Sequence, residues 1–243
     1  MPRIFTHSIK AVLFDVDGAL YYQGRLRLCM ALELSGLPFR RQPEHTASEV
    51  WRALRIFRHV REELRCGAEL PLCLERWQYV AAAQQIDWEP EQLERLVREW
   101  MYRRPLKYLR FCRRRGLEEF LVFLQDSGRR LGVFSDYPVV EKLSSLQCAD
   151  KISVALCATD LEINAFKPSP KGFVHACAHW GLSPREVLYV GDRPEVDALG
   201  ALQAGMPCAI LSPWSPQALL RGETLSYYHV SSFLSLKRML TSS

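Results

Sequence analysis

Short apolar runs alternate with helical segments in the second half of the chain, and this alternation limits the possible folds more than any other feature. The runs are "LGVF" at 131–134, "ISVAL" at 152–156, "VLYV" at 187–190 and "CAIL" at 208–211, each followed by a polar or glycine-bearing loop. Strands that are apolar along their whole length are typical of a sheet covered on both faces, and alternation with helices is typical of parallel strands. We therefore predict an α/β fold with a doubly wound parallel sheet.

Residues 21–107 have a different sequence pattern, with almost no alternation of β-branched and polar residues. Four stretches in this part are expected to be helices, at 24–36, 47–67, 70–86 and 89–104. The last of them opens with Pro90 and glutamates, which is typical of a helix N-terminus. We predict a helical domain at 21–107 that is inserted into a core domain made of residues 1–20 and 108–243.

The first apolar run of the chain, "AVLF" at 11–14, ends directly on two carboxylates. In "KAVLFDVDG" one residue separates Asp15 from Asp17, and a glycine follows. Two carboxylates this close repel each other and raise each other's pKa, so the pattern persists only where a cation or a shared proton offsets the repulsion. The pattern indicates a metal and phosphate site rather than an element of the fold.

Polar residues also follow the later apolar runs. Parallel strands present their carboxyl ends at one edge of the sheet, and ligands bind in the crevice beyond that edge. The residues expected at that edge are Asp15, Asp17, Ser135, Lys167, Gly191 and Asp192. We therefore expect them to converge although they lie far apart in the chain.

A phosphoryl-transfer reaction gives the aspartates distinct tasks. A carboxylate that attacks a phosphoryl group needs a hard, oxygen-liganded cation to cancel the repulsion between the two groups. Asp15 and Asp192 can supply side-chain ligands for that cation, and Mg²⁺ is the expected ion. Asp17 is then free to protonate the leaving oxygen and afterwards to deprotonate water.

The remaining residues at this edge are suited to binding the phosphoryl oxygens. The Ser135 hydroxyl, the neighbouring backbone N–H groups, including that of Asp136, and the Lys167 ammonium can hold these oxygens as charge shifts in the transition state. We therefore expect Ser135, Asp136 and Lys167 to bind the substrate phosphate.

Four segments of the chain resemble, in order, the motifs of the haloacid dehalogenase superfamily. They are "DVDGAL", "VFSD", "AFKPSP" and "VGDRPEVDALGALQAGM", and the resemblance spans about residues 9–212. It is closest to the phosphatase branch in which a helical cap follows the first motif, similar to phosphoglycolate phosphatases. The resemblance implies a Rossmann-like core and a phosphoaspartyl intermediate on Asp15. It also implies Mg²⁺ held by Asp15, the backbone carbonyl of Asp17 and Asp192, with Asp197 positioning the lysine or the water shell of the metal.

The function expected from these features is Mg²⁺-dependent hydrolysis of a phosphate monoester of a small metabolite. Ala19 stands where the family usually has threonine, which removes a hydroxyl but no catalytic group, and the presence of Asp17 disfavours carbon–halogen cleavage. A phosphomutase of the same superfamily and a non-catalytic accessory protein are the alternatives. The buried charges that the site requires count against the accessory protein, because a lost activity would leave them without a reason. The substrate and the oligomeric state do not follow from the sequence.

Composition adds weaker constraints. The net charge of +5 favours anionic ligands only slightly, and no apolar stretch approaches the roughly 18 residues of a membrane span. The eight cysteines form no CxxC pair, so we expect structural thiols in a reducing compartment and a soluble cytoplasmic protein.

Several further residues have two interpretations each. Tyr21 and Tyr22 either face the leaving group or pack where the chain enters the insert. His175 and His179 have the spacing of a metal-binding pair but no evident third ligand. The arginines at 52, 55, 58, 61 and 65 are expected to form a solvated helix face. The run 103–115 holds seven basic residues and no acid; lacking a recognised motif, it is not expected to bind nucleic acid, and its role stays open.

Overall fold

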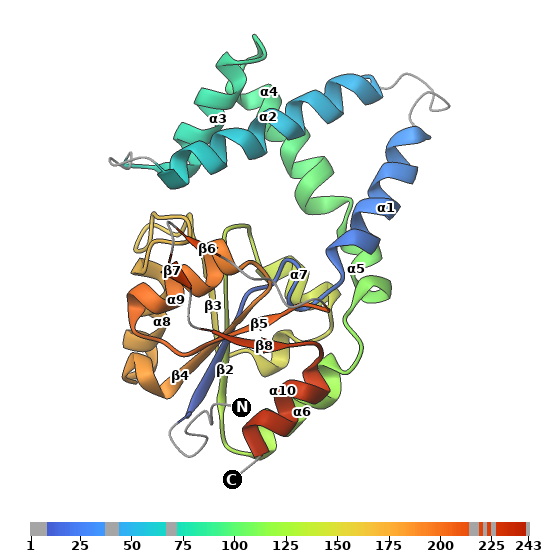
Figure 1. Cartoon of the computed structure of the whole chain (residues 1–243). Helices are drawn as coiled ribbons and strands as arrows, with labels where there is room; N and C mark the ends of the chain where they lie inside the picture. Colours follow the sequence, from blue (N-terminus) through green and yellow to red (C-terminus); the bar gives the residue numbers. More distant parts are fainter. Residues whose placement is uncertain are drawn as a thin grey trace. The chain divides into compact units, whose positions relative to one another are not determined.

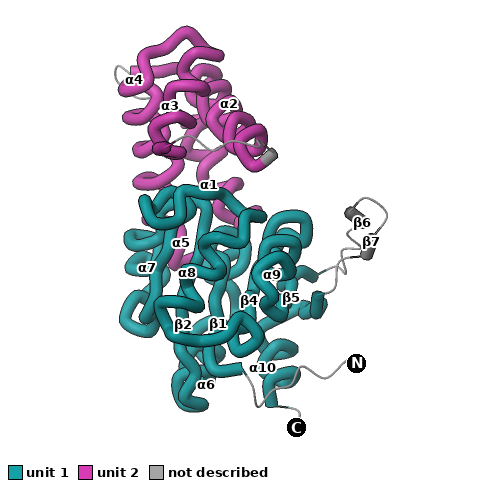
Figure 2. Tube along the Cα trace, turned by 90° about the vertical axis from the view of Figure 1, so that its left-hand side faces the viewer, with its two compact units in different colours: residues 1–22, 113–243 teal, residues 23–112 magenta. Residues whose placement is uncertain are grey.

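The chain divides into two units, which Figure 2 distinguishes by colour: Met1–Tyr22 with Arg113–Ser243, and Gln23–Cys112. The computed structural model describes residues 9–36, 44–66, 72–213, 219–220, 223–224 and 227–241. The second unit begins two residues later than the insert expected at 21–107 and ends five residues after it. Its last helix, α5 (Leu106–Cys112), packs on its first helix, α1 (Gln23–Ser35), and therefore belongs with the insert.

The larger unit is built on a six-stranded sheet of order β3-β2-β1-β4-β5-β8, in which every pairing is parallel. The strands are β1 (Ala11–Phe14), β2 (Arg130–Ser135), β3 (Val154–Cys157), β4 (Val187–Gly191), β5 (Cys208–Leu211) and β8 (Tyr228–Val230). All four residues of β1 are buried, because helices cover both faces. The predicted parallel α/β fold is confirmed. Strand order reverses at β1, which places the topological switch point between β1 and β4.

Helices α6 (Leu117–Asp126) and α10 (Phe233–Thr241) cover one face of the sheet, and α8 (Lys171–Trp180) and α9 (Leu199–Ala204) cover the other (Figure 1). Aromatic side chains fill the first interface: the ring of Phe120 stacks on that of Phe233 at 5.1 Å and meets Phe14 edge-on at 6.2 Å. The short helix α7 (Val140–Ser145) follows β2, and β6 (Leu219–Leu220) pairs antiparallel with β7 (Glu223–Thr224).

The smaller unit is helical throughout its ordered elements. After α1 come α2 (Ala47–Cys66), α3 (Leu74–Gln84), α4 (Pro90–Val97), a π-helical segment (Arg98–Arg103) and α5. Within the described residues, all four stretches predicted as helices are helical, and the fourth changes to π-helix after Val97. Helix α2 packs on α3, where the ring of Phe57 stacks on that of Tyr79 at 4.9 Å.

The predicted solvated face of α2 is wrong at two arginines, Arg61 and Arg65, and the Arg65 side chain is 6% exposed. Arg52, Arg55 and Arg58 are exposed, whereas Arg61 is only 2% exposed. Nine residues separate Arg52 from Arg61, which at 3.6 residues per turn is about two and a half turns and places them on opposite sides of the helix. The guanidinium of Arg61 therefore lies on the apolar side, 5.5 Å from the ring of Phe57.

The basic run 103–115 is partly neutralised by acids from other parts of the chain. Arg104 and Lys107 both form ion pairs with Glu33 of α1, at 2.6 and 2.9 Å. The Glu33 side chain is only 5% exposed, so the contact is an internal one within the smaller unit. The run therefore contributes less free positive charge than its sequence indicates.

Two expectations from composition can be compared with the described residues. The seven cysteines whose side chains are described are free thiols, and five of them are buried, as predicted for structural thiols. None of the described helices has the length and apolar character that a membrane span requires.

Candidate active site

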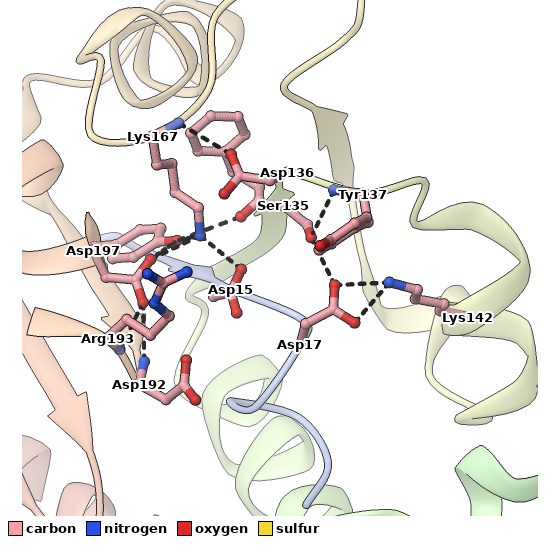
Figure 3. A network of polar contacts seen from close by, with 12 residues as sticks. Asp15, Asp17, Ser135, Asp136, Tyr137, Lys142, Lys167, Asp192, Arg193 and Asp197 are labelled. Atoms are coloured by element: carbon pink, nitrogen blue, oxygen red, sulfur yellow. Dashed lines mark hydrogen bonds and ion pairs between the residues drawn. The ribbon is translucent and has the colours of Figure 1, made fainter. Parts of the chain in front are cut away.

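The carboxyl ends of β1, β2 and β4 bring together the polar residues singled out in the sequence (Figure 3). Phe14 of β1 is in register with Val133 of β2 and with Val190 of β4. The residues that follow these positions consequently lie side by side, since the three strands are parallel. Asp15, Asp17, Ser135, Lys167, Asp192 and Asp197 are the side chains collected at this edge.

Lys167 is the centre of a buried network on one side of this edge. Its Nζ atom lies 2.7 Å from Asp15 Oδ1, 2.7 Å from Asp197 Oδ1 and 3.0 Å from the hydroxyl of Tyr189. Burial alone would lower the pKa of Lys167, but the carboxylates of Asp15 and Asp197 outweigh it and hold that pKa well above its ordinary value. Lys167 is therefore a fixed positive charge directly beside Asp15.

Asp15, Asp192 and Asp197 form an acidic cluster in which one carboxylate oxygen of each lies within 4.8 Å of the others. Burial, followed by the charge of Asp197, raises the pKa of Asp192 from 3.8 to about 7. Its Oδ1 atom is buried and has no hydrogen-bond partner. Burial also raises the pKa of Asp15, although Lys167 opposes the effect.

The charge of the acidic cluster fits a divalent cation. Three carboxylates face the ammonium of Lys167, which forms ion pairs with Asp15 and Asp197. When all three are ionised, they carry more negative charge than one ammonium balances, and a divalent cation would offset the excess. Mg²⁺ prefers oxygen ligands, and the carboxylates supply only oxygen. Asp192 Oδ1 has no hydrogen-bond partner that would compete with the ion. Asp15, Asp192 and Asp197 are the residues that could hold such an ion.

Two glycines leave the space that the carboxylates of the acidic cluster occupy. Gly18 has φ +101°, and a Cβ built on it would lie 2.0 Å from Asp192 Oδ2. A Cβ on Gly191 would lie 2.4 Å from Cγ of Asp197. Any larger residue at either position would push a carboxylate out of place. Steric clash thus explains why glycine occupies both positions.

Asp197 supports the cluster through contacts that use both of its oxygens. Its Oδ1 accepts hydrogen bonds from Lys167 and Tyr189, and its Oδ2 accepts the backbone N–H groups of Asp192 and Arg193 at 3.1 and 3.0 Å. The residue lies on a π-helical segment, Pro194–Ala198. The expected contact between Asp197 and the lysine is present in this network.

The side chain of Asp17 turns away from the acidic cluster. Lys142 Nζ lies 2.7 Å from both of its carboxylate oxygens, Ser135 Oγ lies 3.1 Å from Oδ2, and the Tyr21 hydroxyl donates a hydrogen bond to Oδ1. Burial raises the pKa of Asp17, but the ammonium of Lys142 and these hydrogen bonds outweigh it, so the pKa lies below its ordinary value. Burial and the charge of Asp17 raise the pKa of Tyr21, so this hydroxyl stays a donor.

Asp136 directs its side chain to the backbone. Its Oδ1 atom accepts the N–H of Lys167 at 3.0 Å, which fixes the loop that carries the lysine. A carboxylate would repel phosphate, so a phosphate contact at this position requires the backbone N–H of Asp136. The Ser135 hydroxyl accepts the N–H of Tyr137 at 3.3 Å and donates to Asp17.

Three residues of the site were not identified from the sequence. Lys142 lies on α7 in a stretch without a motif. Tyr189 is a buried hydroxyl inside the apolar run "VLYV", and a phenol in an otherwise apolar strand was a signal that a polar partner lies nearby. Arg114 donates from Nε to the carbonyl of Gly18 at 2.8 Å and thereby holds the loop after β1.

The histidine pair gains no further ligand. His175 is half-buried and His179 exposed, both on α8. Across the described residues, the acidic cluster is the only group of three or more potential metal ligands. Tyr21, for which two roles were considered, is 2% exposed and contacts Asp17.

Comparison with known proteins agrees with this arrangement. A family model described as haloacid dehalogenase-like hydrolase matches residues 9–205. N-acylneuraminate-9-phosphatase of Mus musculus is 36% identical over 76 residues, 31% of this chain and 31% of that protein. Glyceraldehyde 3-phosphate phosphatase of Methanopyrus kandleri is 49% identical over 45 residues, 18% of this chain and 19% of that protein. The chain thus matches less than a third of the length of these relatives. A HAD phosphatase from Thermococcus onnurineus has a similar fold, with a TM-score of 0.65 at 23% identity over 96% of this chain and 98% of that chain.

Proposed function

Because the chain belongs to the haloacid dehalogenase-like hydrolase family, we propose that it is a Mg²⁺-dependent phosphatase that hydrolyses phosphate monoesters through a phosphoaspartyl intermediate on Asp15. One observation carries the proposal. The Asp15 carboxylate contacts the Lys167 ammonium at 2.7 Å and belongs to an acidic cluster that could bind a divalent cation. A nucleophilic carboxylate, a fixed cation and a site for a divalent ion are the groups that attack on a phosphoryl group requires.

The substrate we propose is a small phosphorylated metabolite. The two curated relatives are phosphatases whose names specify N-acylneuraminate 9-phosphate and glyceraldehyde 3-phosphate, both small. We further propose that the helical unit Gln23–Cys112 acts as a cap that selects the leaving group and excludes water during the reaction.

Each residue of the site has a definite task in this reaction. Asp15 attacks phosphorus, and Lys167 and Ser135 hold phosphoryl oxygens as negative charge moves onto them. A bound Mg²⁺ would neutralise the charge between the phosphoryl group and Asp15. Asp17 in its protonated form donates a proton to the leaving oxygen, and the carboxylate that remains accepts one from the water that attacks the phosphoaspartate. Because the pKa of Asp17 lies below its ordinary value, the protonated form is the minor one near neutral pH.

The test separates the two aspartates of the first motif. Asp15→Asn should abolish turnover and leave no covalent phosphoenzyme, because a neutral amide does not attack phosphorus. Asp17→Asn should lose roughly 10²- to 10⁴-fold on an alkyl phosphate but retain phosphoryl transfer from p-nitrophenyl phosphate, whose leaving group needs little protonation.

The measurement is rapid-quench labelling with a ³²P substrate followed by peptide mapping. Label on Asp15 that is released as inorganic phosphate supports the phosphatase. Label that is passed on to a second sugar phosphate identifies a phosphomutase instead. Label on Asp17 or on Ser135, or the absence of label during turnover, contradicts the assigned roles.

A further inference from the structure

Three side chains from separate segments hold the carboxylate of Asp17. Lys142 lies 2.7 Å from both oxygens, Ser135 donates to Oδ2 at 3.1 Å, and Tyr21 donates to Oδ1. Each oxygen therefore has two donors, and the direction of the carboxylate is determined from both sides. Asp15 and Asp17 were expected to work as neighbours, yet their side chains belong to separate networks.

Without these donors, the side chain of Asp17 could turn toward the acidic cluster. It is one residue removed from Asp15, next to the acidic cluster that fits a divalent cation. Figure 3 shows Asp17 pointing toward Lys142, whereas Asp15 lies on the side of Lys167 and Asp197. A free carboxylate this close to a bound cation would be attracted to it, and its proton-transfer position would then be lost.

Lys142 is placed where it can prevent this. It lies on α7, shortly after Ser135, and is only 7% exposed. Among the residues that the structure describes, Asp17 is the only carboxylate within ion-pair distance of its ammonium. A buried ion pair is often no more stabilising than an apolar pair of similar size. The pair is thus better explained by the direction it gives to Asp17 than by stability.

Tyr21 approaches Asp17 from the opposite end of the same loop and is 2% exposed. Its backbone forms an antiparallel bridge with Arg113, and the carbonyl of Leu20 accepts the N–H of Arg114 at 3.0 Å. The two chain segments that lead to the helical unit are tied together here. The backbone at Tyr21 is therefore held in place, and burial of the side chain restricts the position of its hydroxyl.

We propose that Lys142 and Tyr21 are positioning residues that hold Asp17 on the leaving-group side of the site and away from the cation-binding carboxylates. The proposal rests on the phosphatase function above. Proton transfer requires heavy atoms about 2.6–3.2 Å apart, and a displacement of about 1 Å can lower a rate by about 100-fold. Loss of either residue should therefore impair the step that Asp17 performs and spare the attack by Asp15.

The test compares two leaving groups. Phenyl phosphate releases a basic phenolate that needs a proton, whereas p-nitrophenyl phosphate releases one that hardly needs it. Lys142→Met should lower kcat on phenyl phosphate by about 10- to 100-fold and kcat on p-nitrophenyl phosphate by less than about 3-fold. Tyr21→Phe, which removes a single oxygen atom, should show the same pattern with a smaller loss. Lys151→Met is the matched control, because Lys151 forms an ion pair with Glu118 at 3.1 Å outside the site.

A double-mutant cycle makes the test specific. In an Asp17→Asn background, Lys142→Met should not lower kcat on phenyl phosphate any further. A residue that acts only through Asp17 has no effect once the Asp17 carboxylate has been removed. Equal losses on both substrates, or an undiminished loss in the Asp17→Asn background, would show that Lys142 binds phosphate or supports the fold, and would overturn the proposal. No loss in either variant would overturn it as well.

Two controls keep the outcomes separate. If Lys142→Met does not fold, as judged by circular dichroism, Tyr21→Phe decides by the same criteria. The phosphatase function fails if the wild type releases no phosphate or if Asp15→Asn keeps its activity. If the wild type is active and Asp15→Asn is inactive, any failure of the leaving-group pattern concerns only the positioning residues.

Discussion

Replacing Asp192 by asparagine should stabilise the metal-free protein even though it removes a residue of the site. The carboxylate of Asp192 is buried, and its pKa rises from 3.8 to about 7. Asparagine has nearly the same shape and no charge. The folded and unfolded pKa values of Asp192 differ by about 3, and each pKa unit corresponds to about 1.36 kcal/mol. Ionisation of Asp192 therefore lowers the stability of the folded protein by roughly 4 kcal/mol above pH 7.

The sign of the pH dependence follows from proton binding. Between the unfolded value of 3.8 and the folded value of about 7, the folded protein retains a proton that the unfolded chain has lost, so the stability of the metal-free wild type falls as pH rises. The penalty grows by about 1.4 kcal/mol for each pH unit in this window and is constant above it. The free energy of unfolding of Asp192→Asn should exceed that of the wild type, and this excess should be roughly 3 kcal/mol larger at pH 8 than at pH 5.

Thermal unfolding in EDTA at pH 5, 6.5 and 8 measures this difference. Each kcal/mol moves Tm by about 2–4 °C in a protein of this size. Added Mg²⁺ should restore the wild type at pH 8 and have little effect on Asp192→Asn, because the cation replaces the proton on a carboxylate that the variant lacks. The exposed Asp126 of α6 provides the control: Asp126→Asn should follow the wild type at every pH. Parallel pH profiles of wild type and Asp192→Asn, or equal responses to Mg²⁺, would refute the assignment.

Three further results are expected. Turnover should be lost in EDTA, restored by Mg²⁺ and inhibited by Ca²⁺, whose larger and looser shell of ligands misplaces the nucleophile; full activity in excess chelator would exclude the metal. Gly18→Ala should raise the Mg²⁺ concentration required for half-maximal activity, because its Cβ would lie 2.0 Å from Asp192 Oδ2, and an unchanged requirement in a titration would contradict this placement. Replacing residues 24–111 by a short linker should leave a folded core, because Tyr21 and Arg113 already form a backbone bridge, while discrimination between phosphorylated metabolites in a substrate panel is lost; a core that does not fold would show that the helical unit is needed for stability.

The parallel sheet and the identity of most site residues could be predicted from the sequence because both depend on local patterns. A strand covered on both faces must be apolar along its length, and this requirement is visible in runs such as "VLYV" and "CAIL". The chain direction of parallel strands then places the residue after each run at the same edge. Asp15, Ser135 and Asp192 followed from this rule, without knowledge of which strand lies beside which. Strand β8, only three residues long, carried no comparable signal and was missed.

The partners of charged side chains were decided by the tertiary structure. Asp17 is predicted from the sequence to carry a proton, but its contact with Lys142 joins residues 125 positions apart, and no periodicity links them. The acid that neutralises Arg104 is likewise 71 positions away, so the basic run looked more highly charged in the sequence than it is in the fold. Charge pairing depends on which surfaces meet after packing, whereas strand formation depends on burial that the neighbouring residues already encode. The sequence therefore determined most of the groups that the site contains, and the position of Lys142 on α7 decided which way Asp17 points.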